Sequence, residues 1–367
     1  MRKCLLLIAL LVDGLFMVAA ACSNSAAVGP TENYTWPQDP AAGSQKAATV
    51  LHPAGMDDPG IYCDIYVQGR AFPGTTLLAD NHDAGKPRVI EVTMLGQVVW
   101  QYVVPVALAR YTNPGFDAEK LPGGNVLFLL PRYGVFEVDR QGKVVWNCID
   151  GRVSHDADRL ANGNTLVAWG NDSKQDMQAR EINPAGEVVW SWRAFDHFNY
   201  GPYKDIFDDG WTHCNAVERL SNGNTLISLR NFDFVVEAAP SGEVVRRYGE
   251  GIFGDQHDPE LLPDGHILAA NHTPPPPNHA VEIDPATNKI VWSFGGGQWV
   301  PQLARDADRL PNGNTLVCGT DQVVEVTPAG EIVWRLRLRD KIQREEAPSR
   351  GFYKAERYAY PAAGDGR

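Results

Sequence analysis

The chain has 367 residues, of which 44% are hydrophobic, and a formal net charge of −12 at pH 7. This length and apolar content suffice for a large core in one or two domains. The negative charge disfavours a surface built for nucleic acid or anionic lipid, so a group that binds anions must be confined to one pocket. The 35 glycines, 26 prolines and short apolar runs favour an all-β, turn-rich protein.

The N-terminus has the features of an export signal: a basic start, an apolar run and small residues before Cys22. We expect residues 1–22 to be a signal peptide. The sequence AAAC at 19–22 resembles a bacterial lipobox, which predicts lipidation of Cys22 and a membrane contact through the lipid alone. Ser23 follows the cysteine where an Asp would suggest inner-membrane retention, so we expect a periplasmic protein on the outer membrane. Plain cleavage near Ala21, giving a soluble periplasmic or secreted protein, is the alternative.

Residues 23–59 are rich in Ala, Ser, Gly and Pro, and we expect them to be a flexible linker. Four further cysteines follow, none of them in a CxxC pair: Cys63, Cys148, Cys214 and Cys318. An exported protein can pair such residues, but we expect buried free thiols.

One unit recurs along the rest of the chain and predicts the fold. The segment at 211–230 is typical of two short strands joined by an Asn-Gly turn; its sequence is WTHCNAVERLSNGNTLISLR. Near-copies occupy 116–130, 155–169, 257–271 and 305–319, and each is followed by a second hairpin that ends on an apolar strand such as GEVVW. The second strands begin at six aligned positions: Thr75, Asn125, Asn164, Asn224, His266 and Asn314.

Six units of four strands predict a six-bladed β-propeller over residues 60–345. The first unit, from residue 61, is the least regular. Residues 346–367 form a tail, in which 351–360 alternate and could add a closing strand. Five tryptophans at the ends of fourth strands should pack between blades: Trp100, Trp146, Trp190, Trp292 and Trp334.

The candidate site lies on the face that carries the irregular loops, including the insert at 194–210. Nine residues before each aligned position the innermost strands should begin, at Phe116, His155, Asn215, His257 and Arg305. His213 is two residues before Asn215, so strand alternation should place both side chains on one side. Arg230 leaves its strand at the same face, and His272 is the weaker counterpart of Arg230 in the next blade. An acidic residue repeated at 119, 158, 218, 260 and 308 is better explained as part of blade construction.

Several of these segments resemble the bacterial aryl sulfotransferase family, over roughly residues 110–340. They are SHDAD at 154–158, WTHCNAV at 211–217, SLR at 228–230, DQHD at 255–258 and the GEVVW blade endings. The resemblance implies a six-bladed propeller that moves a sulfuryl group from a phenolic sulfate ester to a phenol, without a nucleotide donor, cofactor or metal. It also implies that His257 is the nucleophile, with His155, His213, Asn215 and Arg230 around the sulfuryl oxygens. Further substrate contacts are expected from Trp211, Tyr200, Trp299, Arg305 and His272.

Three other functions fit parts of the pattern. His155, His213 and His257 could hold zinc with an open fourth position, as in a propeller lyase or hydrolase. A non-catalytic lipoprotein propeller that binds a ligand or a protein is the second. The ending NPAGEVVW suggests a pyrroloquinoline-quinone dehydrogenase, which the six repeats and the lack of an adjacent cysteine pair disfavour.

Overall fold

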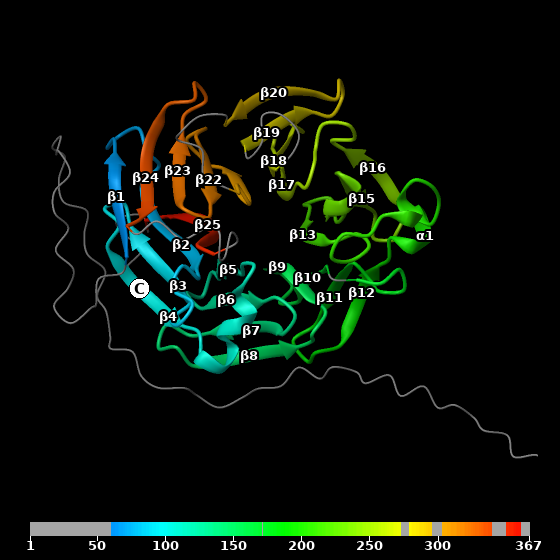
Figure 1. The fold of residues 1–367 in the computed structure, drawn as a ribbon, viewed down its shortest axis with the longest axis horizontal. Helices are drawn as coiled ribbons and strands as arrows, with labels where there is room; N and C mark the ends of the chain where they lie inside the picture. The colour runs from blue at the N-terminus through cyan, green and yellow to red at the C-terminus, as the bar shows by residue number, and fades with distance from the viewer. Residues whose placement is uncertain (1–59, 171, 273–278, 296–302, 340–349, 361–367) are drawn as a thin grey trace, which may run out of the picture.

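A computed structural model of the chain describes residues 60–170, 172–272, 279–295, 303–339 and 350–360. It is a six-bladed β-propeller, as the repeats predict (Figure 1). The expectations for Cys22, for the linker at 23–59 and for Trp299 lie outside the described residues. Within the described part of the chain, no helix is long and apolar enough to cross a membrane.

Blades two to five each contain four consecutive antiparallel strands, ordered from the channel outward. Blade two contains β5 (Asp117–Lys120), β6 (Val126–Leu130), β7 (Gly134–Val138) and β8 (Val144–Ile149). Blade three contains β9 (Val153–Arg159), β10 (Thr165–Trp169), β11 (Ala179–Ile182) and β12 (Val188–Trp192). Blade four contains β13 (Cys214–Arg219), β14 (Thr225–Leu229), β15 (Phe234–Ala238) and β16 (Val244–Tyr248). Blade five contains β17 (His257–Leu261), β18 (Ile267–Asn271), β19 (His279–Asp284) and β20 (Lys289–Phe294).

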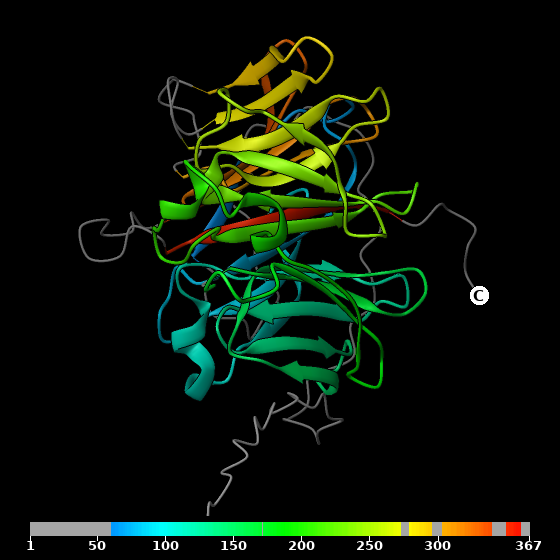
Figure 2. The same cartoon turned by 90° about the vertical axis from the view of Figure 1, so that its right-hand side faces the viewer.

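The two remaining blades join the ends of the described chain. Blade one has β25 (Phe352–Ala359) as its innermost strand, followed by β2 (Gly74–Asp80), β3 (Arg88–Thr93) and β4 (Val98–Val103). Blade six contains β21 (Asp306–Arg309), β22 (Thr315–Gly319), β23 (Gln322–Val326) and β24 (Ile332–Leu338). β1 (Ile61–Tyr66) adds a fifth, outermost strand to blade six, with Ile61 opposite Leu338. Figure 2 shows β25, in red, running through the middle of the molecule.

Short helical turns lie only in the connections between strands of the described residues. The 3-10 helix η1 (Val106–Thr112) links blades one and two. The insert after β12 contains α1 (Phe195–Phe198) and η2 (Tyr203–Asp205), and η3 (Arg230–Phe232) follows β14.

Adjacent blades are joined by a repeated contact of Trp, Arg and Glu. The Trp146 indole N–H donates to the carbonyl of Pro184, 3.1 Å away in the next blade. Arg159 lies over the Trp146 ring and pairs with Glu137 at 2.9 Å, so one cation links blades two and three. Trp190, Trp292 and Trp334 have the same stacked arginine, at Arg219, Arg309 and Arg357. The expected packing of tryptophan between blades is therefore seen.

The repeated acidic residue also joins blades. Glu119, Glu218 and Glu260 accept backbone N–H groups from the innermost strand of the following blade, at Arg159, Leu261 and Arg309. A role in blade construction, as expected from its repetition, accounts for these contacts.

The cysteines divide into two kinds. Cys63, Cys214 and Cys318 are free, and burial raises the pKa of each thiol, which makes it a poor nucleophile. Cys148 is disulfide-bonded, so the expectation of a free thiol is wrong at that position.

Candidate active site at the mouth of the channel

The innermost strands carry a β-bulge at the mouth in four of the six blades. In blade three, for example, pairing is regular as far as Val167–Ala157 and resumes only at Trp169–Val153, so His155 lies in the irregular part. The corresponding interruptions include Asn215, Asp258 and Tyr353. A bulge re-aims side chains and commonly lies beside an active site. In blade three the bulge lets the consecutive residues His155 and Asp156 both contact the closing strand β25, at Tyr353 and Lys354.

Tyr353, on the closing strand β25, lies at the centre of the site. Its ring centroid is 5.2 Å from that of His155 and 6.3 Å from that of His257. The guanidinium of Arg305 lies 5.0 Å from the same ring. The structure therefore brings together three residues predicted from different blades, around a fourth that the sequence analysis missed.

Two further predicted histidines extend this group. The His213 ring stacks 6.0 Å from His155, and the His272 ring stacks 4.4 Å from His257. His213 precedes β13 with a left-handed φ of 46°, and a bulge follows it at Asn215. The argument that strand alternation places His213 and Asn215 on one side is therefore wrong in its geometry. His213 reaches the site through its left-handed backbone instead.

The two remaining predicted residues are held by neighbouring loops. Asn215 donates from Nδ2 to the carbonyl of Gln256 at 2.8 Å, and its buried Oδ1 has no partner among the described residues. Arg230 forms an ion pair with Asp255 at 2.9 Å and lies 3.6 Å from Asp208. Part of the charge of Arg230 is thus already compensated.

Backbone carbonyls fix the tautomers of the buried histidines. Nδ1 of His257 lies 2.9 Å from the carbonyl of Asp255, and Nδ1 of His155 lies 3.2 Å from that of Gly115. A carbonyl oxygen only accepts, so each Nδ1 carries the proton and each Nε2 keeps its lone pair. His272 is the reverse case, because its Nε2 faces the carbonyl of Ala304 at 2.8 Å.

These histidines are neutral at pH 7. Burial lowers the pKa of His257 well below its ordinary value, and nearby His272, Arg305 and Arg230 lower it further. Burial and the neighbouring His213 and Arg305 do the same to the pKa of His155. A neutral imidazole with a free Nε2 is a nucleophile.

Arg305 is a buried cation without an acidic partner among the described residues. It is 7% exposed, and its contacts are the carbonyl of Pro114, 3.3 Å from Nη1, and the ring of Tyr353. Its Nε has no hydrogen-bond partner, and among the described residues no carboxylate lies within ion-pair distance. Burial lowers the pKa of its guanidinium, which nevertheless stays charged. A buried, unpaired guanidinium fits an anionic ligand.

The aromatic residues expected to hold substrate have different positions. Trp211 is 1% exposed, and its indole N–H donates to the carbonyl of Tyr203, so it is a core residue. Tyr200 is 49% exposed and packs on Phe198 and Tyr203.

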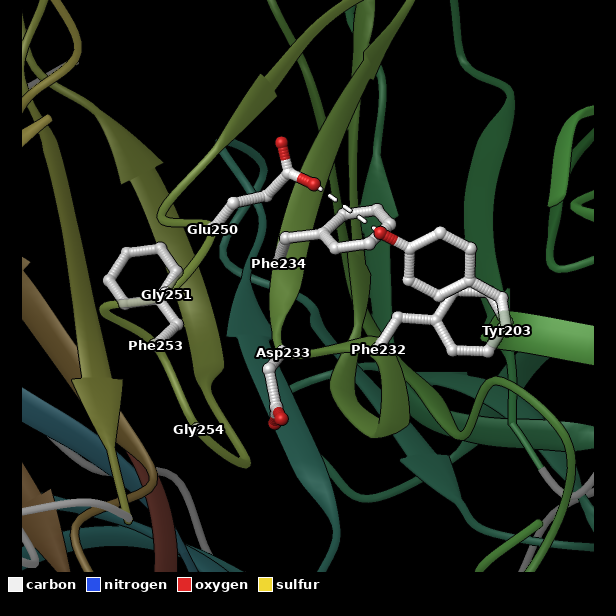
Figure 3. Close-up of a pocket in the computed structure, with 8 residues that line it drawn as sticks. All are labelled: Tyr203, Phe232, Asp233, Phe234, Glu250, Gly251, Phe253 and Gly254. Carbon is white, nitrogen blue, oxygen red and sulfur yellow. Dashed lines mark hydrogen bonds between the residues drawn. The ribbon is translucent and has the colours of Figure 1, made fainter. Parts of the chain in front are cut away.

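A pocket of about 460 Å³ lies beside this insert (Figure 3). Its aromatic lining comes from Tyr203, Phe232, Phe234 and Phe253. Asp233, also in the lining, accepts the backbone N–H of Asp255, the residue that holds both Arg230 and His257. A hydrogen bond therefore joins the pocket, through Asp233, to Asp255, whose carbonyl orients His257.

The zinc alternative does not fit this geometry. His155, His213 and His257 are not among the groups of described residues whose ligand atoms all lie within 4.8 Å of one another. Their rings stack on aromatic neighbours, and two buried or half-buried guanidiniums lie beside them.

The fold and the site together define a β-propeller whose channel mouth combines neutral histidines with a guanidinium that no described carboxylate pairs with. The chain belongs to the arylsulfotransferase (ASST) family, whose model matches residues 55–253, more than half of its length. The matched region contains His155, His213, Asn215 and Arg230; His257 and Arg305 lie beyond it. No curated protein matches the chain.

Solved structures share the propeller fold. A protein of unknown function from Bacteroides caccae is 19% identical, with a TM-score of 0.54 over 77% of this chain and 98% of its own. A streptogramin B lyase is 10% identical, with a TM-score of 0.47 over 77% and 88% of the two chains. A virginiamycin B lyase from Staphylococcus aureus, solved with quinupristin, is 9% identical, with a TM-score of 0.47 over 74% and 86%. At these identities the likeness concerns the fold alone.

Proposed function

We propose that the protein transfers a sulfuryl group from a phenolic sulfate ester to a phenol through a sulfohistidine at His257. The observation that carries the proposal is the pairing of two features at the channel mouth. One is Arg305, a buried guanidinium with no acidic partner in the part of the chain that the structure describes, and the other is His257, a neutral imidazole with a free Nε2. A sulfate monoester supplies the anion that the first needs and the electrophilic sulfur that the second attacks.

In the first half-reaction, Nε2 of His257 attacks sulfur and the bond from sulfur to the phenolic oxygen breaks. The phenolate leaves with the bonding electron pair. The positive charge that develops on the imidazole is shared with Nδ1–H, which donates to the carbonyl of Asp255. Arg305 and Arg230 offset the negative charge on the sulfuryl and phenolic oxygens, a stabilisation worth a few kcal/mol per donor.

In the second half-reaction, the oxygen of an acceptor phenol attacks the sulfur and the bond from sulfur to nitrogen breaks. The electron pair returns to Nε2, which regenerates neutral His257. His213, half-buried and neutral because burial and Arg230 lower its pKa, takes the phenol proton as general base.

The direct test of this function is incubation of the purified protein with 4-nitrophenyl sulfate and phenol. We expect release of 4-nitrophenolate together with phenyl sulfate. Without phenol, release should stop after one equivalent, because the sulfuryl group stays on the enzyme. Failure to release nitrophenolate under either condition would contradict the proposal.

Replacement of the buried guanidinium of Arg305 should weaken transfer strongly. We expect Arg305→Met to lower kcat/KM for 4-nitrophenyl sulfate by roughly 10²–10³-fold, the usual effect of losing one stabilising donor. Steady-state kinetics measure the change. Arg152→Met is the matched control, because Arg152 lies on the surface with its own partner, Asp150. Equal activity of Arg305→Met and wild type would show that the sulfuryl group binds elsewhere.

The acid limb of the pH–rate profile should lie below the ordinary histidine pKa of 6.5. Only neutral His257 attacks sulfur, and its lowered folded-state pKa keeps it neutral as pH falls through that value. We therefore expect kcat/KM to stay constant from pH 8 to 6.5 and to fall only at lower pH. An acid limb centred at or above 6.5 would mean that the nucleophile is solvated, contrary to its burial.

A further inference from the structure

Below the mouth, the channel wall is dominated by carboxyl groups. Side chains two residues apart on an innermost strand face the same side. We call the residue that directly follows each mouth residue the first level. It comprises Asp117, Asp156, Ala216, Asp258, Asp306 and Lys354. The residues two positions further along each strand form the second level. They are Glu119, Asp158, Glu218, Glu260, Asp308 and Glu356. These twelve positions hold ten carboxyl groups and one ammonium, so their charges do not balance.

Lys354 forms ion pairs with three of the four aspartates of the first level. Its Nζ lies 2.5 Å from Asp156, 2.6 Å from Oδ1 of Asp258 and 3.9 Å from Asp117. Asp306 has no ion pair with Lys354 or with any other described residue. A charge buried without a partner is costly, and burial together with the neighbouring carboxylates raises the pKa of Asp306 and Asp308. These carboxyls therefore either keep a proton or gain a cation as counter-charge.

Asp306 is both buried and incompletely bonded. It is 2% exposed, and its Oδ2 accepts the N–H of Ala355 at 2.7 Å. Its Oδ1 is buried and has no hydrogen-bond partner among the described residues. Asp258 and Asp308 lie beside it, and one carboxylate oxygen from each of the three lies within 4.8 Å of the others. Two carboxylates this close hold either a shared proton, which raises the pKa of Asp306 beside Asp258, or a cation.

We infer that Asp258, Asp306 and Asp308 bind a divalent cation of the Ca²⁺ type inside the channel. All three ligands are carboxylate oxygens, the donors that hard cations prefer, and Ca²⁺ binds them at about 2.3–2.6 Å, so that ligands on opposite sides of the ion lie about 5 Å apart. The separation of these oxygens fits within that span. Asp258 would bridge Lys354 and the ion, which adds a counter-charge beside Asp306, the aspartate with which Lys354 forms no ion pair.

The experiment is thermal unfolding of the full chain, freed of metal with EDTA and then titrated with CaCl₂. We expect Ca²⁺ to raise the Tm by roughly 5 °C or more at saturation, as a ligand that binds only the folded state must. Isothermal titration should give one ion per chain, and Mg²⁺ should bind more weakly because it requires a tighter octahedron. Neither measurement depends on sulfuryl transfer, so the inference and the proposed function can fail separately.

Two variants locate the ion. Asp308→Asn should reduce Ca²⁺ affinity at least tenfold, and Asp306→Asn should abolish the Tm shift; if Asp306→Asn does not fold, Asp308→Asn alone decides. Asp264→Asn is the matched control, because Asp264, His266 and Glu282 form the other acidic group on the described residues that could hold an ion. Absence of any Ca²⁺-dependent shift in the wild type would overturn the inference. So would a shift that survives Asp308→Asn or disappears in Asp264→Asn.

Discussion

His257→Ala is expected to abolish turnover of 4-nitrophenyl sulfate, including the first-equivalent release of nitrophenolate. The physical reason is covalent: the sulfuryl group must rest on a nucleophile between donor and acceptor. Among the buried histidines of the site, His257 combines a carbonyl-bound Nδ1 with contacts to both Tyr353 and His272. Steady-state release of nitrophenolate, followed by absorbance, measures the loss.

The sulfuryl adduct provides an independent measurement. Wild-type protein quenched during turnover at alkaline pH should carry a sulfuryl mass increment on the peptide containing His257, and brief acid treatment should remove it. His266→Ala is the matched control, because His266 is paired with Glu282 at 2.7 Å, away from the channel. Near-full activity of His257→Ala would reject this assignment. His155, whose Nε2 also keeps its lone pair, would then be the next candidate nucleophile.

The fold was predictable because its determinants are local and repeated. Each Asn-Gly hairpin defines two neighbouring strands, and six aligned copies define six blades. The position of β1 was not predictable in this way. Residues 61–66 alternate like any strand, and only the contact of Ile61 with Leu338, far away in sequence, places them on blade six.

The candidate site was predictable where a mouth residue precedes a hairpin of the repeat. His155, His257 and Arg305 were found by counting back from the aligned second strand. Tyr353 was missed because β25 follows no hairpin of its own and pairs with β2, which lies at the other end of the propeller. A signal was nevertheless present: YKAER at 353–357 has the same order of residue types as HDADR at 155–159 and RDADR at 305–309. Alignment of the tail to the innermost strands would have placed Tyr353 at the mouth.

The bulges were the second limit on sequence reasoning. A period of two cannot show that neighbours such as His155 and Asp156 both reach the interior, because a bulge breaks that period. Nor could the sequence separate Arg230, which has an acidic partner, from Arg305, which has none among the described residues. That difference arises from loops packed around each guanidinium.

The same closing strand carries the residue whose loss should most destabilise the protein. Lys354→Met is expected to lower the free energy of unfolding by roughly 3–5 kcal/mol, the usual cost of leaving buried charges without their partner. Lys354 is 8% exposed and contacts Asp156 and Asp258 at 2.5 and 2.6 Å, so in protein freed of metal its removal leaves both carboxylates without a counter-charge. Thermal or denaturant unfolding measures the loss, which corresponds to a drop in Tm of roughly 10 °C.

The pH dependence and a second variant separate this electrostatic effect from lost packing. Burial raises the pKa of Asp258, but Lys354 and a side-chain hydrogen bond with Asp306 more than offset this and leave the pKa below the ordinary value of 3.8. A lowered carboxyl pKa stabilises the folded state above the unfolded pKa, and that stability is lost as pH falls through the folded pKa. The deficit of Lys354→Met should therefore be largest at neutral pH and shrink as pH falls and Asp258 takes up a proton in the variant. Lys354→Met combined with Asp258→Asn should recover part of it, whereas Lys120→Met should cost less, because its partner Glu91 retains Arg140 at 2.8 Å. A deficit independent of pH and unchanged by Asp258→Asn would show that the aliphatic chain of Lys354, rather than its charge, stabilises the ring.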